Sequence, residues 1–238
     1  MKRILLMVVR KLWMVIPTWI KLCYHAAHPD KFTDEEDLKI FKYIVYHAND
    51  GGNVTIDGHG MDNIPKEGGF LITPNHQGMY DALAIMSVID QPIALVAKKE
   101  VANVPLLKQV FVCTHSFLLD RDDPREGLKV ILGVAEELKK GRNYVIFPEG
   151  TRSKIGNRVG EFKGGSFKAA IKAKAPILPV ALINSFVPFD ENTIRPVTVQ
   201  VHFLPPLYYE DYKNMKTVQI AALVQKQIQE CILENEEK

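Results

Sequence analysis

The chain has 238 residues, which is enough for one domain of ordinary size with a small additional segment. Hydrophobic residues make up 47% and charged residues 24% of it, and these values exclude a wholly disordered protein. The net charge of +2 is unevenly distributed, because residues 1–29 hold five basic side chains and no acidic one, which leaves 25 basic and 28 acidic residues elsewhere. A mildly acidic body argues against nucleic-acid binding, and three widely spaced cysteines supply neither a disulfide framework nor a zinc site.

The N-terminal segment is the most apolar part of the chain and carries this excess of positive charge. Its longest uncharged stretch, 12–20, is much shorter than the roughly 20 apolar residues that span a bilayer, and two basic residues at 10–11 precede it. Both tryptophans, Trp13 and Trp19, lie here. We therefore predict a helical anchor that lies on the membrane surface, with a helix that docks on its own domain as the alternative. Pro17 is expected to kink this helix or to divide it.

Beyond the anchor, short apolar runs alternate with segments of helical periodicity. The predicted strands are 54–56, 70–73, 93–97, 116–119, 144–147, 177–183 and 197–203. The predicted helices are 34–47, 81–89, 124–140, 166–173 and 217–233, and Asp123 is expected to cap the third of them. This alternation predicts an α/β fold with a largely parallel sheet covered by helices.

The first of two polar turns, TPNHQGMYD at 73–81, directly follows a predicted strand. His76 and Asp81 would point about 140° apart on one helix, so they meet only if His76 lies on the turn and Asp81 begins the next helix. Gly78 makes so tight a turn possible. Asp81 would then fix one imidazole nitrogen and leave the other free to take a proton from an alcohol or thiol. The sequence contains no G-x-S-x-G elbow, which favours direct attack by a substrate hydroxyl; a purely structural turn is the alternative.

The second polar turn, FPEGTRS at 147–153, also follows a predicted strand. Its glycine and Arg152 would present backbone N–H groups and a guanidinium together, which suits a phosphate. A helix that opens beside Lys163 is another candidate anion site. Arg121, at the end of a predicted strand, is a further basic position. A structural ion pair with acidic neighbours is the alternative for both arginines.

Taken in order, these segments resemble the 1-acylglycerol-3-phosphate acyltransferase family, the glycerolipid acyltransferases that make phosphatidic acid. The resemblance rests on four blocks and a basic stretch between the first two, which are NHQGMYD at 75–81, AKKE at 97–100, FLLDR at 117–121, FPEGTRS at 147–153 and APILPV at 175–180. It covers about half of the chain, and the uninterrupted third block is its most specific part.

The resemblance implies transfer of a fatty acyl group from a thioester donor, acyl-CoA or acyl carrier protein, to the sn-2 hydroxyl of 1-acylglycerol-3-phosphate (lysophosphatidic acid). The product would be phosphatidic acid for phospholipid synthesis. His76 would be the general base and Asp81 the partner that holds its tautomer. The resemblance also implies a set of substrate-binding residues, with the arginines on the acceptor's phosphate: Lys98, Arg121, Glu149, Gly150, Thr151 and Arg152. The family needs no metal, cofactor or prosthetic group.

Two alternatives stay open at this point. One is an acyltransferase for glycerol-3-phosphate or another lysolipid, and the other is a non-catalytic anionic-lipid-binding protein, which would not need His76 and Asp81 together. Because a lysolipid acceptor lies in the bilayer, we expect a monotopic or peripheral protein at the cytoplasmic face of the cell membrane. Residues 1–50 would then form the membrane-associating segment and 51–238 the catalytic domain. The expected partners are the thioester donor, lysophosphatidic acid and the membrane surface, without nucleic acid.

Overall fold

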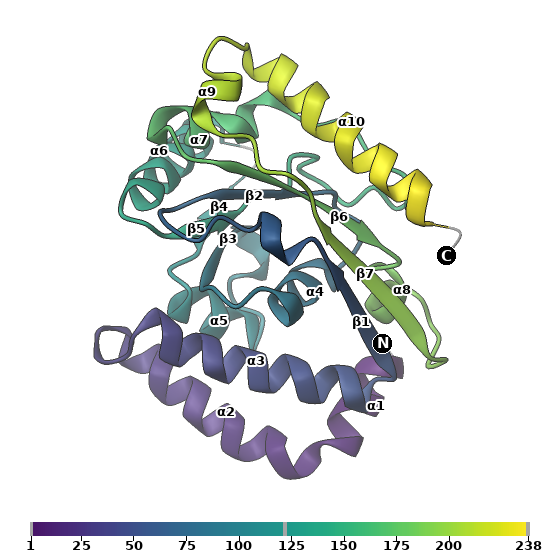
Figure 1. Ribbon diagram of the computed structural model, residues 1–238. Coiled ribbons are helices and arrows are strands. Elements are labelled where there is room, and N and C mark those ends of the chain that lie inside the picture. The colour runs from purple at the N-terminus through teal and green to yellow at the C-terminus, as the bar shows by residue number, and fades with distance from the viewer. Residues whose placement is uncertain (1, 121–122, 237–238) are drawn as a thin grey trace.

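A mixed β-sheet forms the centre of the molecule in the computed structural model, which describes residues 2–120 and 123–236 (Figure 1). The described residues form seven strands, β1 Val54–His59, β2 Leu71–Pro74, β3 Ile93–Lys98, β4 Phe117–Leu119, β5 Asn143–Val145, β6 Ile177–Ile183 and β7 Val197–Phe203. Their order is β1-β7-β6-β2-β5-β3-β4, and every neighbouring pair is parallel except β6 with β7. The prediction of an α/β fold with a largely parallel sheet is confirmed.

Helices cover both faces of this sheet. The α-helices are α1 Lys2–Arg10, α2 Leu12–Ala27, α3 Asp34–Gly51, α4 Asp81–Val88, α5 Leu107–Cys113, α6 Pro124–Lys139, α7 Lys168–Ala173, α8 Val187–Asp190, α9 Tyr209–Tyr212 and α10 Thr217–Asn235. On one face, α6, α7 and α10 pack on the strands through one apolar cluster (Figure 1). On the other face, α1, α3, α4 and α5 share a second apolar cluster, and α2 packs on α3 and α5 through a third. Because helices cover both faces of the sheet, the central strands are buried on both sides, which explains why they are so apolar.

The two strands at the centre, β2 and β6, are buried along their whole length. They pair in parallel, with Leu71 opposite Ile177 and Pro74 opposite Val180. Their carboxyl ends therefore reach the same edge of the sheet, and the loops that follow them meet there. In open α/β sheets this edge is where ligands bind, and the first polar turn lies on it.

Most predicted helices are present with small changes at their ends. Asp123 caps α6 as predicted, because its Oδ1 accepts hydrogen bonds from the backbone N–H groups of Arg125 and Glu126. The helix predicted at 34–47 continues to Gly51. Helix α5 was not predicted from the sequence, since its seven residues give the apolar spacing too little length to stand out.

The N-terminal helix is not divided at Pro17, one of the two effects predicted for this proline. Helix α2 passes through Pro17, and the chain breaks at Lys11 instead, between α1 and α2. Two side chains at this break bind the end of α3: Arg10 Nη1 donates to the carbonyl of Gly51 at 3.2 Å, and Lys11 forms an ion pair with Asp50. These contacts fix the break, and they come from residues about forty positions further along the chain. No helix in the described part of the chain is long and apolar enough to cross a membrane.

A histidine pair between β1 and β7 makes the stability of the fold depend on pH. The ring of His202 stacks on that of His59, with centroids 4.4 Å apart. Burial, followed by the neighbouring His59, lowers the pKa of His202 to about 4. Between about pH 6.5 and pH 4 the unfolded chain therefore binds a proton that the folded protein does not. Stability is fully present above this window and falls as the pH drops through it, by up to about 3 kcal/mol.

We expect His202→Gln to reduce this pH dependence, because glutamine carries no titrating group. Urea unfolding at pH 7.5 and pH 5 would measure the difference in the free energy of unfolding for both proteins. An equal loss of stability in the parent protein and in the variant would show that other groups cause it.

Candidate active site

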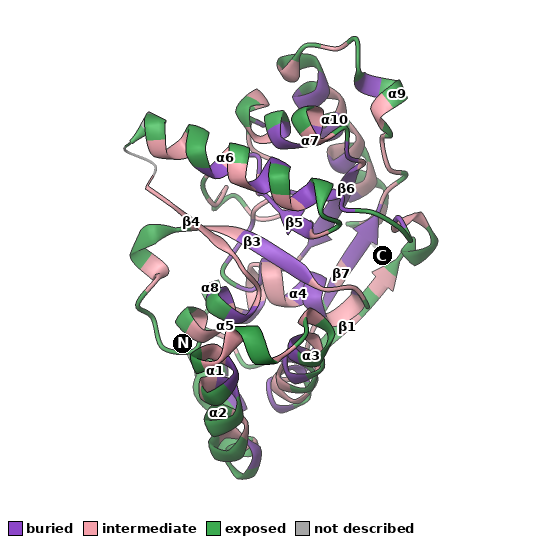
Figure 2. Ribbon diagram, turned by 90° about the vertical axis from the view of Figure 1, so that its left-hand side faces the viewer, coloured by how far each residue is buried: buried purple, intermediate pink, exposed green. Residues whose placement is uncertain are grey.

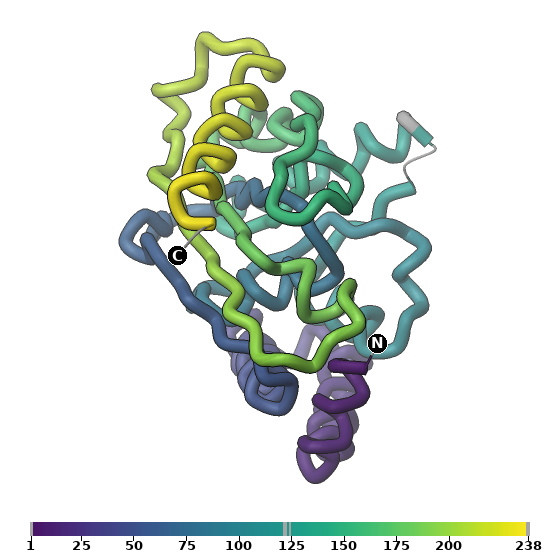
Figure 3. Tube along the Cα trace, turned by 90° about the vertical axis from the view of Figure 1, so that its right-hand side faces the viewer, coloured from purple at the N-terminus to yellow at the C-terminus, as the bar shows by residue number. Residues whose placement is uncertain are grey.

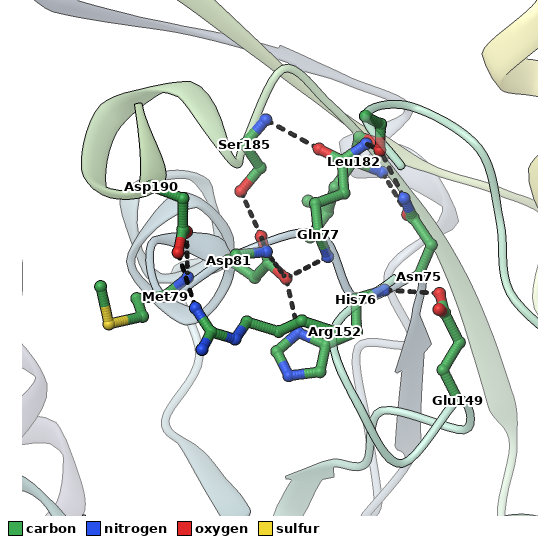
Figure 4. Close-up of polar contacts among 12 residues, drawn as sticks. Asn75, His76, Gln77, Met79, Asp81, Glu149, Arg152, Leu182, Ser185 and Asp190 are labelled. Carbon is green, nitrogen blue, oxygen red and sulfur yellow. Dashed lines mark hydrogen bonds and ion pairs between the residues drawn. The ribbon is translucent and has the colours of Figure 1, made fainter. Parts of the chain in front are cut away.

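His76 and Asp81 lie together at the carboxyl end of β2 (Figure 4). His76 is on the turn that follows the strand, and Asp81 is the first residue of α4. The imidazole Nδ1 lies 2.7 Å from Asp81 Oδ2. Asp81 is 1% exposed, whereas the ring of His76 is partly open to solvent. The turn and the helix thus bring together two side chains that one continuous helix would separate.

Asp81 is the acceptor at the centre of this turn. Besides the contact with His76, its two oxygens accept hydrogen bonds from the backbone N–H of Gln77 at 2.7 Å, from that of Gly78 at 3.0 Å and from Ser185 Oγ at 2.6 Å. A carboxylate surrounded by donors accepts from Nδ1 as well, so the imidazole proton lies on Nδ1. In the described part of the chain Nε2 has no hydrogen-bond partner, and it is the nitrogen that is free to accept a proton.

Two neighbours of His76 explain the local geometry. Asn75 continues the pairing of β2 with β6 beyond Pro74, because its amide donates to the carbonyl of Leu182 at 3.0 Å and accepts from the N–H of Leu182 at 2.7 Å. Gly78 is required for close approach, since a β-carbon there would lie 2.3 Å from Asp190 Oδ2. The absence of a side chain at Gly78 therefore lets α8 approach this turn, while the φ of Gly78 itself lies outside the left-handed region.

The second polar turn wraps around His76. The ring of Phe147 stacks on the imidazole with centroids 4.1 Å apart. Glu149 Oε1 accepts from the backbone N–H of His76 at 2.8 Å, and the N–H of Ser153 donates to the carbonyl of His76 at 2.9 Å. The FPEGTRS block thus holds the ring and both backbone polar groups of the same histidine.

Glu149 faces inward from this turn. It is buried, and burial raises the pKa of its carboxyl group, an effect partly opposed by hydrogen bonds from the backbone of His76 and of Gly160. Gly160 must be glycine for this approach, because a β-carbon would lie 2.5 Å from Glu149 Oε2. The carboxylate therefore contacts the backbone that carries His76 rather than open solvent.

The other members of the block lie nearer the surface. Gly150 has a φ of 71°, which favours glycine, and Thr151 is exposed. Arg152 Nη1 lies 2.6 Å from Asp190 Oδ1. The ion pair that the sequence left open as an alternative thus forms, though with a residue of α8. Asp190 Oδ2 also accepts from the backbone N–H of Met79 at 3.0 Å, so Asp190 joins the arginine to the first polar turn (Figure 4).

Three basic positions singled out in the sequence remain, Lys98, Arg121 and Lys163. Lys98, at the end of β3, forms an ion pair with Glu100 at 2.5 Å. Arg121 lies outside the described residues. Lys163 does not mark an open helix end, since the next residue, Gly164, packs against the beginning of α10, where a β-carbon would meet Thr217 Oγ1 at 2.9 Å. In the described part of the chain, no group of three or more His, Cys, Asp or Glu side chains is arranged to hold a metal ion.

Two side chains at the site were not predicted from the sequence, Ser185 and Asp190. Both follow β6, whose carboxyl end adjoins that of β2. The available signal is weak: a polar Asn184-Ser185 pair directly after an unbroken apolar run. Only the strand order shows that this pair reaches the turn of His76.

Comparison with known proteins agrees with the four blocks. Residues 55–183 match the model of the Acyltransferase family. The 1-acyl-sn-glycerol-3-phosphate acyltransferase of Salmonella typhimurium is 33% identical over 156 residues, which are 65% of this chain and 63% of that protein. The enzyme of that name from Cocos nucifera is 31% identical over 70% of this chain and 53% of its own, and that from Helicobacter pylori is 30% identical over 64% and 70%. The chain thus spans between half and two thirds of the length of the first two relatives.

The fold agrees as well. The crystal structure of PlsC, the 1-acyl-sn-glycerophosphate (LPA) acyltransferase from Thermotoga maritima, superposes with a TM-score of 0.75 over 98% of both chains, at 21% sequence identity. The matched family model covers β1 to β6, which includes both polar turns and the His76–Asp81 pair. The chain belongs to the acyltransferase family, among the relatives of the 1-acylglycerol-3-phosphate acyltransferases.

Proposed function

We propose that the protein transfers a fatty acyl group from a thioester donor to the sn-2 hydroxyl of 1-acylglycerol-3-phosphate, giving phosphatidic acid for phospholipid synthesis. The observation that supports this most strongly is the His76–Asp81 contact of 2.7 Å, held inside the FPEGTRS block with Nε2 free. The names of several relatives, each a 1-acyl-sn-glycerol-3-phosphate acyltransferase, point to the same acceptor.

The proposed reaction needs no nucleophile from the protein. Nε2 of neutral His76 takes the proton of the acceptor hydroxyl while the hydroxyl oxygen attacks the thioester carbonyl. The C–S bond then breaks, and the imidazolium returns the proton to the leaving sulfur, so that an ester and a free thiol result. Asp81 holds Nδ1–H and stabilises the positive charge that develops on the ring. A positioned base contributes ~10²–10⁴-fold, and backbone N–H groups of the two turns would stabilise the oxyanion.

Among the residues that the structure describes, Arg152 is well placed for the acceptor's phosphate. Its side chain is 36% exposed and uses Nη1 for Asp190, which leaves its other N–H groups for a ligand. The resemblance to the family adds further residues to the proposed acceptor site: Lys98, Arg121, Glu149, Gly150 and Thr151. The donor is proposed to be acyl-CoA or acyl carrier protein.

We also propose that residues 1–50 rest on the cytoplasmic surface of the cell membrane, ahead of a catalytic domain at 51–238. Helices α1 and α2 dock on the body through a few buried side chains, among them Met7, Met14 and Leu22. Much of the rest of these helices is exposed (Figure 2), and many of the exposed side chains are large and apolar. The large apolar side chains of these helices that are more than half exposed are Leu5, Val9, Leu12, Trp13, Ile16, Ile20 and Tyr24. Such a face suits the interfacial region of a bilayer.

The positive charges of this segment support the proposal less than its apolar face does. Arg3 is 1% exposed and donates to backbone carbonyls of the body, and both Arg10 and Lys11 bind the end of α3. Three of the five basic residues, Lys2, Arg10 and Lys21, are exposed, and of these Arg10 is held at the end of α3. Salt is therefore expected to weaken membrane binding only partly.

The combined substitution Leu12→Ser, Ile16→Ser and Ile20→Ser is expected to release the protein from anionic vesicles. These residues recur every four positions on the exposed side of α2, and the change removes roughly 4 kcal/mol or more of apolar transfer free energy. Vesicle flotation would measure binding, and activity is expected to fall at least about 10-fold on bilayer-borne acceptor but little on a short-chain soluble one.

The matched control is Val218→Ser with Leu233→Ser on α10, which replaces two equally exposed apolar residues. Helix α10 and the N-terminal helices lie at opposite ends of the molecule (Figure 3). The control protein should float with vesicles like the parent. If the α2 variant also floats, the membrane contact lies elsewhere on the body.

The reaction itself is tested with purified protein in detergent, lysophosphatidic acid, and acyl-CoA or acyl carrier protein as the donor in separate assays. Formation of phosphatidic acid with either donor is the expected result. Turnover only with glycerol-3-phosphate or another lysolipid would favour the alternative acceptor. Binding of anionic lipid without any turnover, and without need of His76, would favour a lipid-binding protein instead.

A further inference from the structure

Ser185 completes the environment of the His76–Asp81 pair from the opposite side. It is fully buried, and its Oγ donates to Asp81 Oδ1 at 2.6 Å (Figure 4). The other carboxylate oxygen, Oδ2, lies 2.7 Å from His76 Nδ1. Backbone N–H groups of Gln77 and Gly78 also donate to this carboxylate, and Ser185 is the side-chain donor on Oδ1. Its hydrogen bond adds to those that restrict rotation of the carboxylate and so keep Oδ2 facing the imidazole.

The chain is built to present Ser185 in this way. Strand β6 ends at Ile183, and Asn184 has a φ of 61°, a left-handed conformation that turns the chain back toward the site. The backbone N–H of Ser185 then donates to Gln77 Oε1 at 2.8 Å. Gln77 Nε2 in turn donates to Asn157 Oδ1 at 2.9 Å, and the same oxygen accepts from the N–H of Asn184 at 2.8 Å. Both the serine and the turn of His76 are therefore held by one network of partly buried amides.

We propose that Ser185 is a positioning residue for the general base, an inference that rests on the proposed function. Its hydroxyl fixes the carboxylate of Asp81 so that Oδ2 stays in line with Nδ1–H, and it shares the negative charge of that carboxylate. The serine touches neither the acceptor nor the donor, and it acts on the reaction through Asp81 alone.

The loss of this hydrogen bond has a predictable sign in the pH profile. Without the Ser185 donor, the carboxylate of Asp81 carries more negative charge toward the imidazole and stabilises its protonated form. His76 must be neutral to act as the base, so the acidic limb of the profile of kcat/KM moves to higher pH. Among the residues that the structure describes, the other charged groups near the imidazole are Glu149, at its backbone N–H, and the Arg152–Asp190 pair beside the turn. None of these contacts Ser185, and the variant leaves them in place.

Ser185→Ala is the direct test. We expect kcat to fall about 10-fold, as the loss of one hydrogen bond to a charged group predicts, while KM for acceptor and donor changes little. Ser185→Cys keeps nearly the same volume with a weaker donor, so its kcat is expected to lie between those of the parent and the alanine variant. Ser87→Ala is the matched control: this hydroxyl lies on the same helix as Asp81, and it donates to the carbonyl of Leu83 without touching the pair.

The outcomes separate this inference from a structural role and from the proposed function. A Ser185→Ala protein with kcat within about twofold of the parent overturns the inference, and so does a lower kcat with an unmoved acidic limb and no recovery in Ser185→Cys. If the alanine variant does not fold, the pH profile of Ser185→Cys decides. Activity that survives His76→Ala would instead refute the proposed function, whereas an inactive His76→Ala beside a fully active Ser185→Ala refutes this inference alone.

Discussion

Replacing His76 with alanine should abolish turnover and leave the melting temperature close to that of the parent protein. Its ring is partly exposed and makes two contacts, the bond to Asp81 and the stack on Phe147, so little packing is lost. A general base contributes ~10²–10⁴-fold, so kcat should fall by at least that range. Steady-state kinetics with lysophosphatidic acid and a thioester donor, together with thermal melting of both proteins, would measure the two effects.

Asp81→Asn should abolish turnover as well, but with a clear loss of stability. The loss of stability is expected because Asp81 accepts from four different donors while almost fully buried. An asparagine keeps one acceptor oxygen and turns an NH₂ group toward donors, which leaves buried polar groups unpaired. If either variant keeps more than about 10% of kcat, the general base lies elsewhere.

The central strands are the part of the fold that the sequence predicts best. The predicted ranges 177–183 and 197–203 coincide with β6 and β7. Each residue of β6 is buried between two helical layers, so its apolar run is unbroken and ends at a polar residue. The break between α1 and α2, in contrast, could not be predicted from the sequence. Pro17 is a local signal, but the position of the break depends on contacts of residues 10 and 11 with the end of α3, which no local pattern contains.

The residues of the site also differ in whether the local sequence predicts their contacts. The His76–Asp81 contact follows from stereochemistry over five residues, because only a turn followed by a helix allows it. Ser185 and Asp190 join the same turn from 104 and 111 positions further along the chain. Their spacing carries no information about contact until the order of β2 and β6 is known. For Arg152 the sequence shows its place in the FPEGTRS block, but it does not show that Asp190 is its ion-pair partner.

Arg152→Ala should raise KM for the acceptor by about 10- to 100-fold, which is the effect of losing a charge-assisted hydrogen bond. The ion pair of Arg152 with Asp190 adds to this expectation. Two causes act in the same direction. The variant loses the guanidinium that would bind the phosphate, and it leaves the carboxylate of Asp190 without its cation, beside the place proposed for the phosphate. KM for the thioester should change little.

The second cause can be isolated with a double-mutant cycle. Asp190→Asn in the Arg152→Ala background removes the uncompensated charge but keeps an oxygen that accepts from the N–H of Met79, so part of the acceptor affinity should return. The matched control is Arg142→Ala, because Arg142 has a similar exposure and forms ion pairs with Asp34 and Glu137, but precedes β5 whereas the FPEGTRS block follows it.

The kinetic constant that changes identifies the ligand of Arg152. A raised KM for the acceptor, with recovery in the double variant, agrees with a phosphate bound between the arginine and the turn of His76. A raised KM for the thioester alone would mean that Arg152 binds phosphates of the donor, and the acceptor site would then have to be sought on other basic residues. Arg142 precedes β5, whereas the block that carries Arg152 follows the opposite end of that strand. An equal rise of KM in Arg142→Ala would therefore show that the change reflects the overall positive charge of the protein.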